Sequence, residues 1–201
     1  MPAFTSTLAP VETLWGKPDT ATERLPGIWD VSTPSHGGFV LSDERQAAMP
    51  ESLRLDGPSY EKHVDWSLVV LAFEAELRRS GDRLLDIELP LAHQTARNWR
   101  PARYAAFTGT AVEPRDSYVL RRQAAYEAQI GRIVVVSAFG DWADWVPKGK
   151  VGLIGQRLRS VDHLGFPAHE GPQHRALADA DRYDSGKTVN AFDDIGAELI
   201  A

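Results

Sequence analysis

Four polar side chains have the chemistry of metal ligands or acid–base groups. His36 stands in a glycine-rich stretch, Glu61 and Asp65 are four residues apart, and Asp141 follows a strongly apolar run. Residues i and i+4 share one face of a helix, so a helix here would place Glu61 and Asp65 together. Around one cleft with His36 and Asp141, they would offer oxygen and nitrogen ligands to a divalent ion. One interpretation is therefore a metal-dependent hydrolase or nuclease that uses His36, Glu61, Asp65 and Asp141.

The glycines that follow His36, in the sequence S-H-G-G-F of residues 35–39, allow a second kind of chemistry. Backbone N–H groups in such a stretch can approach an oxyanion, as they do in some esterases. The chain has no G-x-S-x-G nucleophile elbow, P-loop, dinucleotide-binding fingerprint or H-E-x-x-H motif. It also lacks cysteine, which excludes thiolate ligands and cysteine nucleophiles. We therefore interpret residues 35–39 as a hairpin turn that needs positive φ, and we expect no cofactor and favour a non-enzymatic protein.

A different set of residues is suited to contact with a partner protein. Two Asp-Trp pairs follow an apolar strand, and loops that leave a rigid strand often carry function. The net charge is −6, and residues 161–201 hold eight acids against three bases. This balance disfavours direct nucleic-acid binding and suits a basic partner, although a solvated tail would look the same. The candidate contact residues are Trp142, Asp144, Trp145, Asp179, Asp181 and Asp184.

One local patch points the other way. Arg97, Arg100 and Arg103 lie close in sequence to Trp99 and Tyr104. Arginines interleaved with aromatic residues are typical of nucleic-acid contacts. A third interpretation is thus an oligomeric regulator that uses this patch on nucleic acid.

The elements that would position these residues indicate an α+β fold. In residues 60–79, apolar residues recur at helical spacing, which predicts a central buried helix that begins after Ser59 and ends at Gly81. Residues 115–129 predict a second helix, and Ser42 a cap of a short one. Strands are expected at residues 28–32, 132–139 (covered on both faces) and 151–158. We expect a small antiparallel sheet packed against the central helix and the second helix.

Length and composition bound the organisation. A chain of 201 residues predicts a single domain over 1–201, with a core at about 13–158 and an acidic, weakly patterned segment at 159–201. No apolar run approaches the ~20 residues of a membrane span. The N-terminus lacks the basic and apolar regions of a secretory signal. We therefore expect a cytoplasmic protein.

Several short motifs resemble a family defined by a domain of unknown function. They are Trp15-Gly16, Pro26-Gly27-Ile28-Trp29, residues 35–39 with Ser42, Tyr60-Glu61, Asp65-Trp66, Gly140-Asp141-Trp142 and Val146-Pro147 with Gly149. The resemblance covers most of residues 13–158. Similar proteins have an acidic stretch where this chain has Lys62-His63, which weakens any shared metal site.

The resemblance implies a setting rather than a mechanism. The family is carried on plasmids, phages and integrative elements of proteobacteria and has no assigned activity. Small acidic proteins of mobile elements often counter host defences. The expectation is a binding protein, of the anti-CRISPR or anti-restriction kind, that docks on a basic nucleic-acid-handling protein or ribonucleoprotein of a bacterial host.

Overall fold

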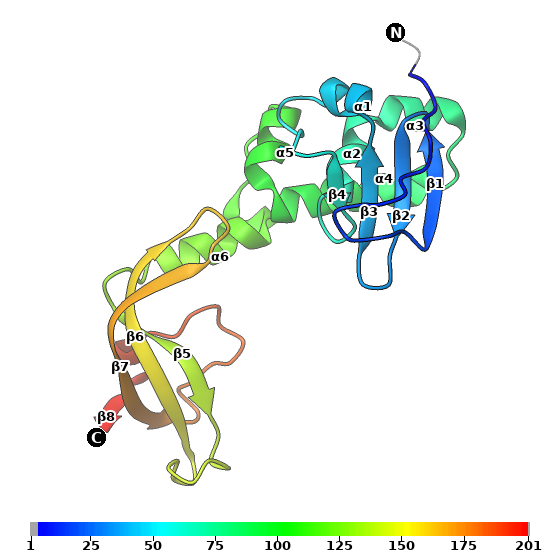
Figure 1. Cartoon of the computed structure of the whole chain (residues 1–201). Helices are drawn as coiled ribbons and strands as arrows, with labels where there is room; N and C mark the ends of the chain where they lie inside the picture. Colours follow the sequence, from blue (N-terminus) through cyan, green and yellow to red (C-terminus); the bar gives the residue numbers. More distant parts are fainter. Residues whose placement is uncertain (1–3, 201) are drawn as a thin grey trace. The chain divides into compact units, whose positions relative to one another are not determined.

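The computed structural model describes residues 4–200. This range contains two four-stranded antiparallel sheets and seven α-helices, most of which are labelled in Figure 1. The α+β class is therefore confirmed. The contacts divide the chain into two compact units, unit 1 ending at Ser117 and unit 2 beginning at Tyr118, where the sequence led us to expect one domain. Each unit has its own sheet and its own buried apolar clusters.

None of the helices in residues 4–200 combines the length and the hydropathy that a membrane crossing requires.

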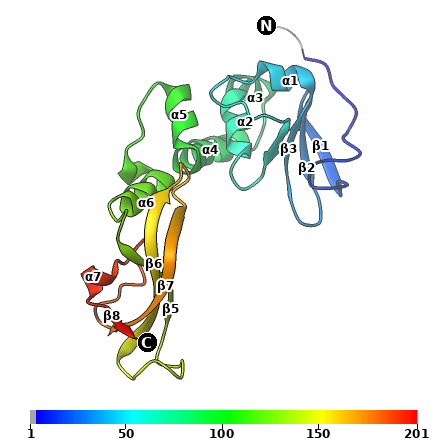
Figure 2. The same cartoon turned by 60° about the vertical axis from the view of Figure 1, so that its left-hand side comes forward.

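Unit 1 is a sheet covered by helices. Its strands, in spatial order, are β1 (Thr20–Leu25), β2 (Ile28–Ser32), β3 (Gly37–Leu41) and β4 (Ser59–Glu61). Its helices are α1 (Asp43–Ala48), α2 (Trp66–Ala72), α3 (Glu74–Ser80), α4 (Leu85–Trp99), α5 (Pro101–Thr108) and the 3₁₀ helix η1 (Pro114–Asp116). Figure 2 shows α2, α3 and α4 on one side of the sheet. On the other side the N-terminal segment is held to β2, because Trp29 Nε1 donates to Thr7 Oγ1 at 2.9 Å.

The single helix expected over residues 60–79 is wrong at its start. Tyr60 lies in β4 and pairs with Phe39 of β3. Its ring is completely buried, and its hydroxyl accepts the N–H of Leu55 (3.1 Å) and donates to Gln46 Oε1 (3.0 Å). These long-range bonds outweigh the helical pattern of the sequence, so this stretch enters the core as a strand.

The helical part of the same stretch is divided into two. Helix α2 begins at Trp66, and the backbone leaves helical geometry at Phe73 (φ −113°, ψ 17°) before α3 starts. Phe73 is buried among the core side chains. Gly81 closes α3 with φ 71°, and Ser42 caps α1 by accepting the N–H of Arg45, so both capping predictions are confirmed.

Unit 2 is a second antiparallel sheet with two helices. Its elements are α6 (Tyr118–Glu127), β5 (Ile133–Phe139), β6 (Lys150–Val161), β7 (Pro167–Asp179), α7 (Phe192–Ile195) and β8 (Glu198–Ile200), and the strand order is β5-β6-β7-β8. Phe192 and Ile195 of α7 pack on Val151 and Leu153 of β6. The short terminal helix thereby fills one side of the sheet.

The segment 159–201, expected to be acidic and weakly patterned, contains a strand of 13 residues that pairs with β6 from Lys150 to Val161. One prediction for this unit is wrong. The strand at residues 132–139 was expected to be covered on both faces, yet only Val134 of β5 is fully buried, and Ser137 and Ala138 are exposed. A continuous β-branched run therefore did not indicate a two-sided core here.

Candidate functional site

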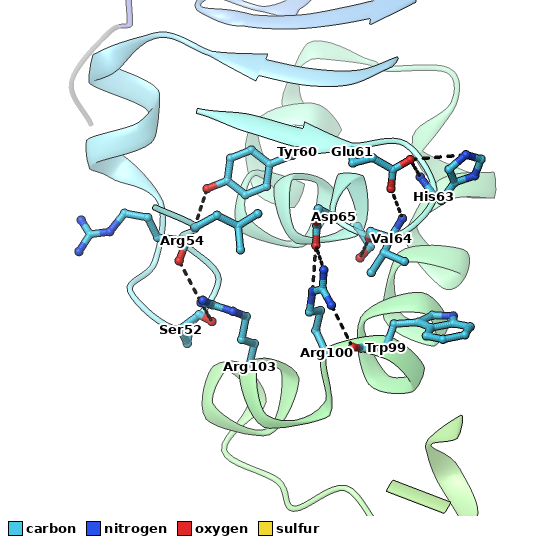
Figure 3. Close-up of polar contacts among 12 residues, drawn as sticks. Ser52, Arg54, Tyr60, Glu61, His63, Val64, Asp65, Trp99, Arg100 and Arg103 are labelled. Atoms are coloured by element: carbon cyan, nitrogen blue, oxygen red, sulfur yellow. Dashed lines mark hydrogen bonds and ion pairs between the residues drawn. The ribbon is translucent and has the colours of Figure 1, made fainter. Parts of the chain in front are cut away.

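Glu61 and Asp65 do not share a helix face, contrary to the prediction. Glu61 ends β4, and Asp65 immediately precedes α2. As Figure 3 shows, the Glu61 carboxylate accepts the backbone N–H groups of His63 (2.8 Å) and Val64 (3.3 Å) and lies 3.5 Å from His63 Nε2. Its oxygens therefore fix the turn between β4 and α2.

Asp65 is engaged with arginine. Its Oδ1 lies 2.9 Å from both Nε and Nη2 of Arg100, at the junction of α4 and α5. Nearby, Arg103 Nη1 donates to the carbonyl oxygens of Ser52 (3.2 Å) and Arg54 (2.9 Å) (Figure 3). Two arginines of the predicted basic patch therefore have structural contacts. Arg100 holds the start of α2, and Arg103 holds the segment that connects α1 to β4.

The remaining two members of the predicted metal cluster lie in different units. His36 is exposed in the turn between β2 and β3, with Nδ1 3.0 Å from Ser35 Oγ. Asp141 is exposed after β5. Residues 4–200 contain no group of three or more His, Asp or Glu side chains that could hold a metal ion.

The predicted contact loop, residues 140–149, has one packed and one exposed indole. Trp145 meets the Phe139 ring edge-on at 5.5 Å between centroids. The guanidinium carbon of Arg175 lies over the Trp145 ring, 4.4 Å from the ring centroid. The ring of Trp142 is 6.1 Å from Phe139, but 75% of this residue is exposed. We call residues 140–149 the Trp142 loop.

The predicted acidic contact residues differ in how far they are neutralised. Asp179 accepts a hydrogen bond from Lys150 Nζ at 2.6 Å, which lowers the pKa of Asp179 below its ordinary value. Asp184 accepts the N–H of Gly186 at 2.8 Å. Asp144 and Asp181 are exposed. The carboxylate at position 179 is therefore paired with a base of the same sheet.

The excess of acidic residues is larger in unit 1 than in unit 2. Residues 118–201 hold eleven acids against ten bases, because residues 118–160 hold seven bases against three acids. Arg132, for example, lies 2.6 Å from Asp194 and 3.6 Å from Asp193. Residues 1–117 hold seventeen acids against twelve bases. Most of the net negative charge thus belongs to unit 1.

The sequence analysis missed a cavity in unit 1. It has a volume of about 350 Å³, and its lining residues are Asp30, Gly38, Phe39, Lys62, Trp66, Glu88 and Leu91. Asp30 of β2 lies directly opposite Phe39 of β3, so both side chains project to the helix-covered face of the sheet. The available signal was that Asp30 is two residues from the buried Ile28, because such residues share a strand face. We call this the Asp30 cavity.

The charges at this cavity are arranged around Arg24. Its guanidinium lies 2.8 Å from Asp82 Oδ1 and 2.7 Å from Glu88 Oε2, with its central carbon 5.5 Å from the Phe39 ring centroid. Desolvation raises the pKa of Asp30 above its ordinary value; the charge of Arg24 opposes this, and that of Glu88 adds to it. A carboxylate with a raised pKa in a cavity is a candidate for function.

Asp30→Asn is expected to raise the midpoint of thermal unfolding at pH 7 and to leave it nearly unchanged at pH 3. A carboxyl whose pKa is raised by folding makes the ionised form unfavourable in the folded state. That cost is present above the folded pKa and disappears below the unfolded value of 3.8. Calorimetry at both pH values measures the effect, with Asp86→Asn at an exposed position of α4 as the control. A lower midpoint for Asp30→Asn at pH 7 would contradict this account.

Comparison with known proteins identifies the family. No curated protein and no solved structure matches the chain. The model of a domain of unknown function, DUF7007, matches residues 8–130. The match includes every residue that lines the Asp30 cavity and ends before the β5–β8 sheet. The chain therefore belongs to the DUF7007 family.

Proposed function

We propose that this protein acts by binding, as an accessory protein of a mobile genetic element that inhibits a host defence system. The partner in this proposal is a bacterial protein or ribonucleoprotein with a basic nucleic-acid channel, and the inhibition is of the anti-CRISPR or anti-restriction kind. The mobile-element setting comes from the motif resemblance described above. The proposed mode of action, binding to a basic partner, is supported by exposed side chains and by the charge of the folded chain.

The exposed indole of Trp142 is the observation that carries the proposal. Large aromatic side chains are enriched among the residues that contribute most to protein interfaces, and Trp142 is 75% exposed. The Phe139 ring lies beneath it at the end of β5. Asp141 and Asp144, both exposed, flank it in sequence. An aromatic anchor between two carboxylates suits a basic partner surface.

The charge of unit 1 supports the same class of partner. With seventeen acids against twelve bases in residues 1–117, contact with phosphate groups is unfavourable, and association with a basic surface is accelerated. In unit 2, Asp181 and Asp184 are exposed, whereas Asp179 is neutralised by Lys150. In this proposal the acidic residues attract and orient the basic partner, and the Trp142 indole supplies apolar surface that is buried on binding.

Trp142→Ala is expected to weaken inhibition of the target complex by about ten- to hundredfold, the range for loss of an aromatic anchor. The assay is nuclease activity of purified CRISPR effector and restriction complexes, titrated with the protein. Leu199→Ala is the matched control, because Leu199 is an exposed apolar residue of the same unit, on β8. Its inhibition should equal that of the parent protein.

Two outcomes would count against the proposal. Equal inhibition by Trp142→Ala and the parent protein would remove the Trp142 loop from the interface. Failure of the parent protein to inhibit or bind any complex of either class would remove the anti-defence role itself.

A further inference from the structure

The Asp30 cavity has walls of a defined kind. Phe39, Trp66 and Leu91 contribute apolar surface from β3, α2 and α4, and Gly38 of β3 also lines the cavity. The volume of about 350 Å³ lies at the lower end of the range for small-molecule sites. Apolar and aromatic walls around a few polar groups are the usual composition of such sites.

The charge balance at the cavity leaves one carboxylate uncompensated. Arg24 is shared between Asp82 and Glu88, so its single positive charge faces two acids before Asp30 is counted. Lys62 supplies a second positive charge at the cavity. Three carboxylates and two cations leave a net charge of about −1 at the site.

The existing cation shows what chemistry the walls accept. The Arg24 guanidinium already lies 5.5 Å from the centroid of Phe39, within the range of a cation–π contact. Of the aromatic side chains, Trp has the strongest cation–π interaction, and Trp66 lines the same cavity. The Asp30 carboxylate projects to the same face as Phe39, and within residues 4–200 it has no hydrogen-bond or ion-pair partner.

We propose that the Asp30 cavity binds an alkyl-guanidinium or alkylammonium group, with Asp30 as its counter-ion and Phe39 and Trp66 as its aromatic walls. The group arrives either on a free small amine or as an arginine or lysine side chain of a polypeptide. This inference concerns unit 1 and does not depend on the Trp142 loop or on the anti-defence role.

Substitution of Lys62 distinguishes a cationic ligand from an anionic or zwitterionic one. If the ligand is a cation, the ammonium of Lys62 repels it, and removal of Lys62 strengthens binding. If the cavity takes an anion or a zwitterion, Lys62 is the attractive group, and its removal weakens binding. Lys62 is exposed, so its substitution leaves the core intact.

The test is a titration of the ¹⁵N-labelled full chain, followed by amide and indole signals of the residues that line the cavity. The probes are agmatine, N-acetyl-arginine amide and N-acetyl-citrulline amide, the last being a neutral isostere of the second. Agmatine or the arginine probe should shift these signals, and citrulline should not. Asp30→Asn should raise the Kd at least about tenfold, and Lys62→Ala should lower it about two- to fivefold. Asp86→Asn, on the exposed face of α4, should leave it unchanged.

The outcomes separate the two sources and the alternatives. Binding of the arginine probe alone assigns the site to a polypeptide side chain, and binding of agmatine as well admits free amines. Equal binding of citrulline and arginine, unchanged binding to Asp30→Asn, weaker binding to Lys62→Ala, or no shift with any probe would overturn the proposal. The unfolding midpoint of Asp30→Asn at pH 7, measured by calorimetry, separates a loss of binding from a loss of folding.

Discussion

Gly38→Ala is expected to prevent unit 1 from folding stably, with a loss of about 3 kcal/mol or more in the free energy of unfolding. Gly38 has φ 147°, a conformation that residues with a Cβ rarely adopt. A Cβ at this position would collide with the carbonyl oxygen of Tyr60 and lie 3.0 Å from the Cα of Glu61. Both neighbours are backbone atoms of β4, so no side chain can move aside, and β3 and β4 must separate.

The measurement is urea or thermal unfolding followed by circular dichroism, with Gly57→Ala as the matched control. Gly57 has no atom within 4 Å of an added Cβ, so alanine there should leave stability unchanged or raise it slightly by restricting the unfolded chain. A Gly38→Ala protein that unfolds at the same urea concentration as the parent would show that β4 does not lie against β3 as described.

The same glycine shows why the S-H-G-G-F motif was misplaced. The sequence predicted a turn that needs positive φ, but the turn precedes the glycines, and Gly37 and Gly38 lie inside β3. Gly37 lies against the carbonyl of Val31, just as Gly38 lies against Tyr60. The glycines are required because three strands approach closely, a constraint that involves residues far apart in the chain. Local turn chemistry does not contain that information.

Features set by neighbouring residues were predictable. The strand at residues 28–32, the cap of α1 by Ser42 and the left-handed Gly81 after α3 all follow from local backbone preferences. Features that depend on the pairing of distant strands were not predictable from the sequence. His169 and His174 lie in β7, opposite Leu158 and Gly155, in a stretch without alternating apolar residues. Its strand character comes from hydrogen bonds to β6.

The helix face expected for Glu61 and Asp65 was wrong for a related reason. Glu61 and Asp65 were assigned to one helix face, and only the pairing of Tyr60 in β4 moves Glu61 off that helix. Asp30, in contrast, was passed over because a polar residue in a half-buried strand is usually on the wet face. Its position opposite Phe39 depends on the register of β2 and β3, and two walls of the cavity come from α2 and α4.

Arg45→Ala is expected to cost about 3–5 kcal/mol in the free energy of unfolding, the range for removing one partner of a buried charged network. Arg45 is 1% exposed and joins three parts of unit 1. Its Nε donates to the carbonyl of Pro26 at 2.7 Å, its Nη1 lies 2.8 Å from Glu76 Oε2, and its guanidinium carbon is 4.9 Å from the Phe73 ring centroid. Alanine would leave the carbonyl and the carboxylate without this donor and open a cavity between α1 and α3.

Two further variants separate charge from volume in this prediction. Arg45→Met fills much of the same space without donors, so it should lose less stability than Arg45→Ala and more than the control Arg83→Ala, which alters an exposed residue. Urea unfolding at pH 7 ranks the three. If Arg45→Met were as stable as the parent, the hydrogen bonds to Pro26 and Glu76 would contribute nothing net. Packing against the Phe4 and Phe73 rings would then explain the burial of a charged side chain in the core.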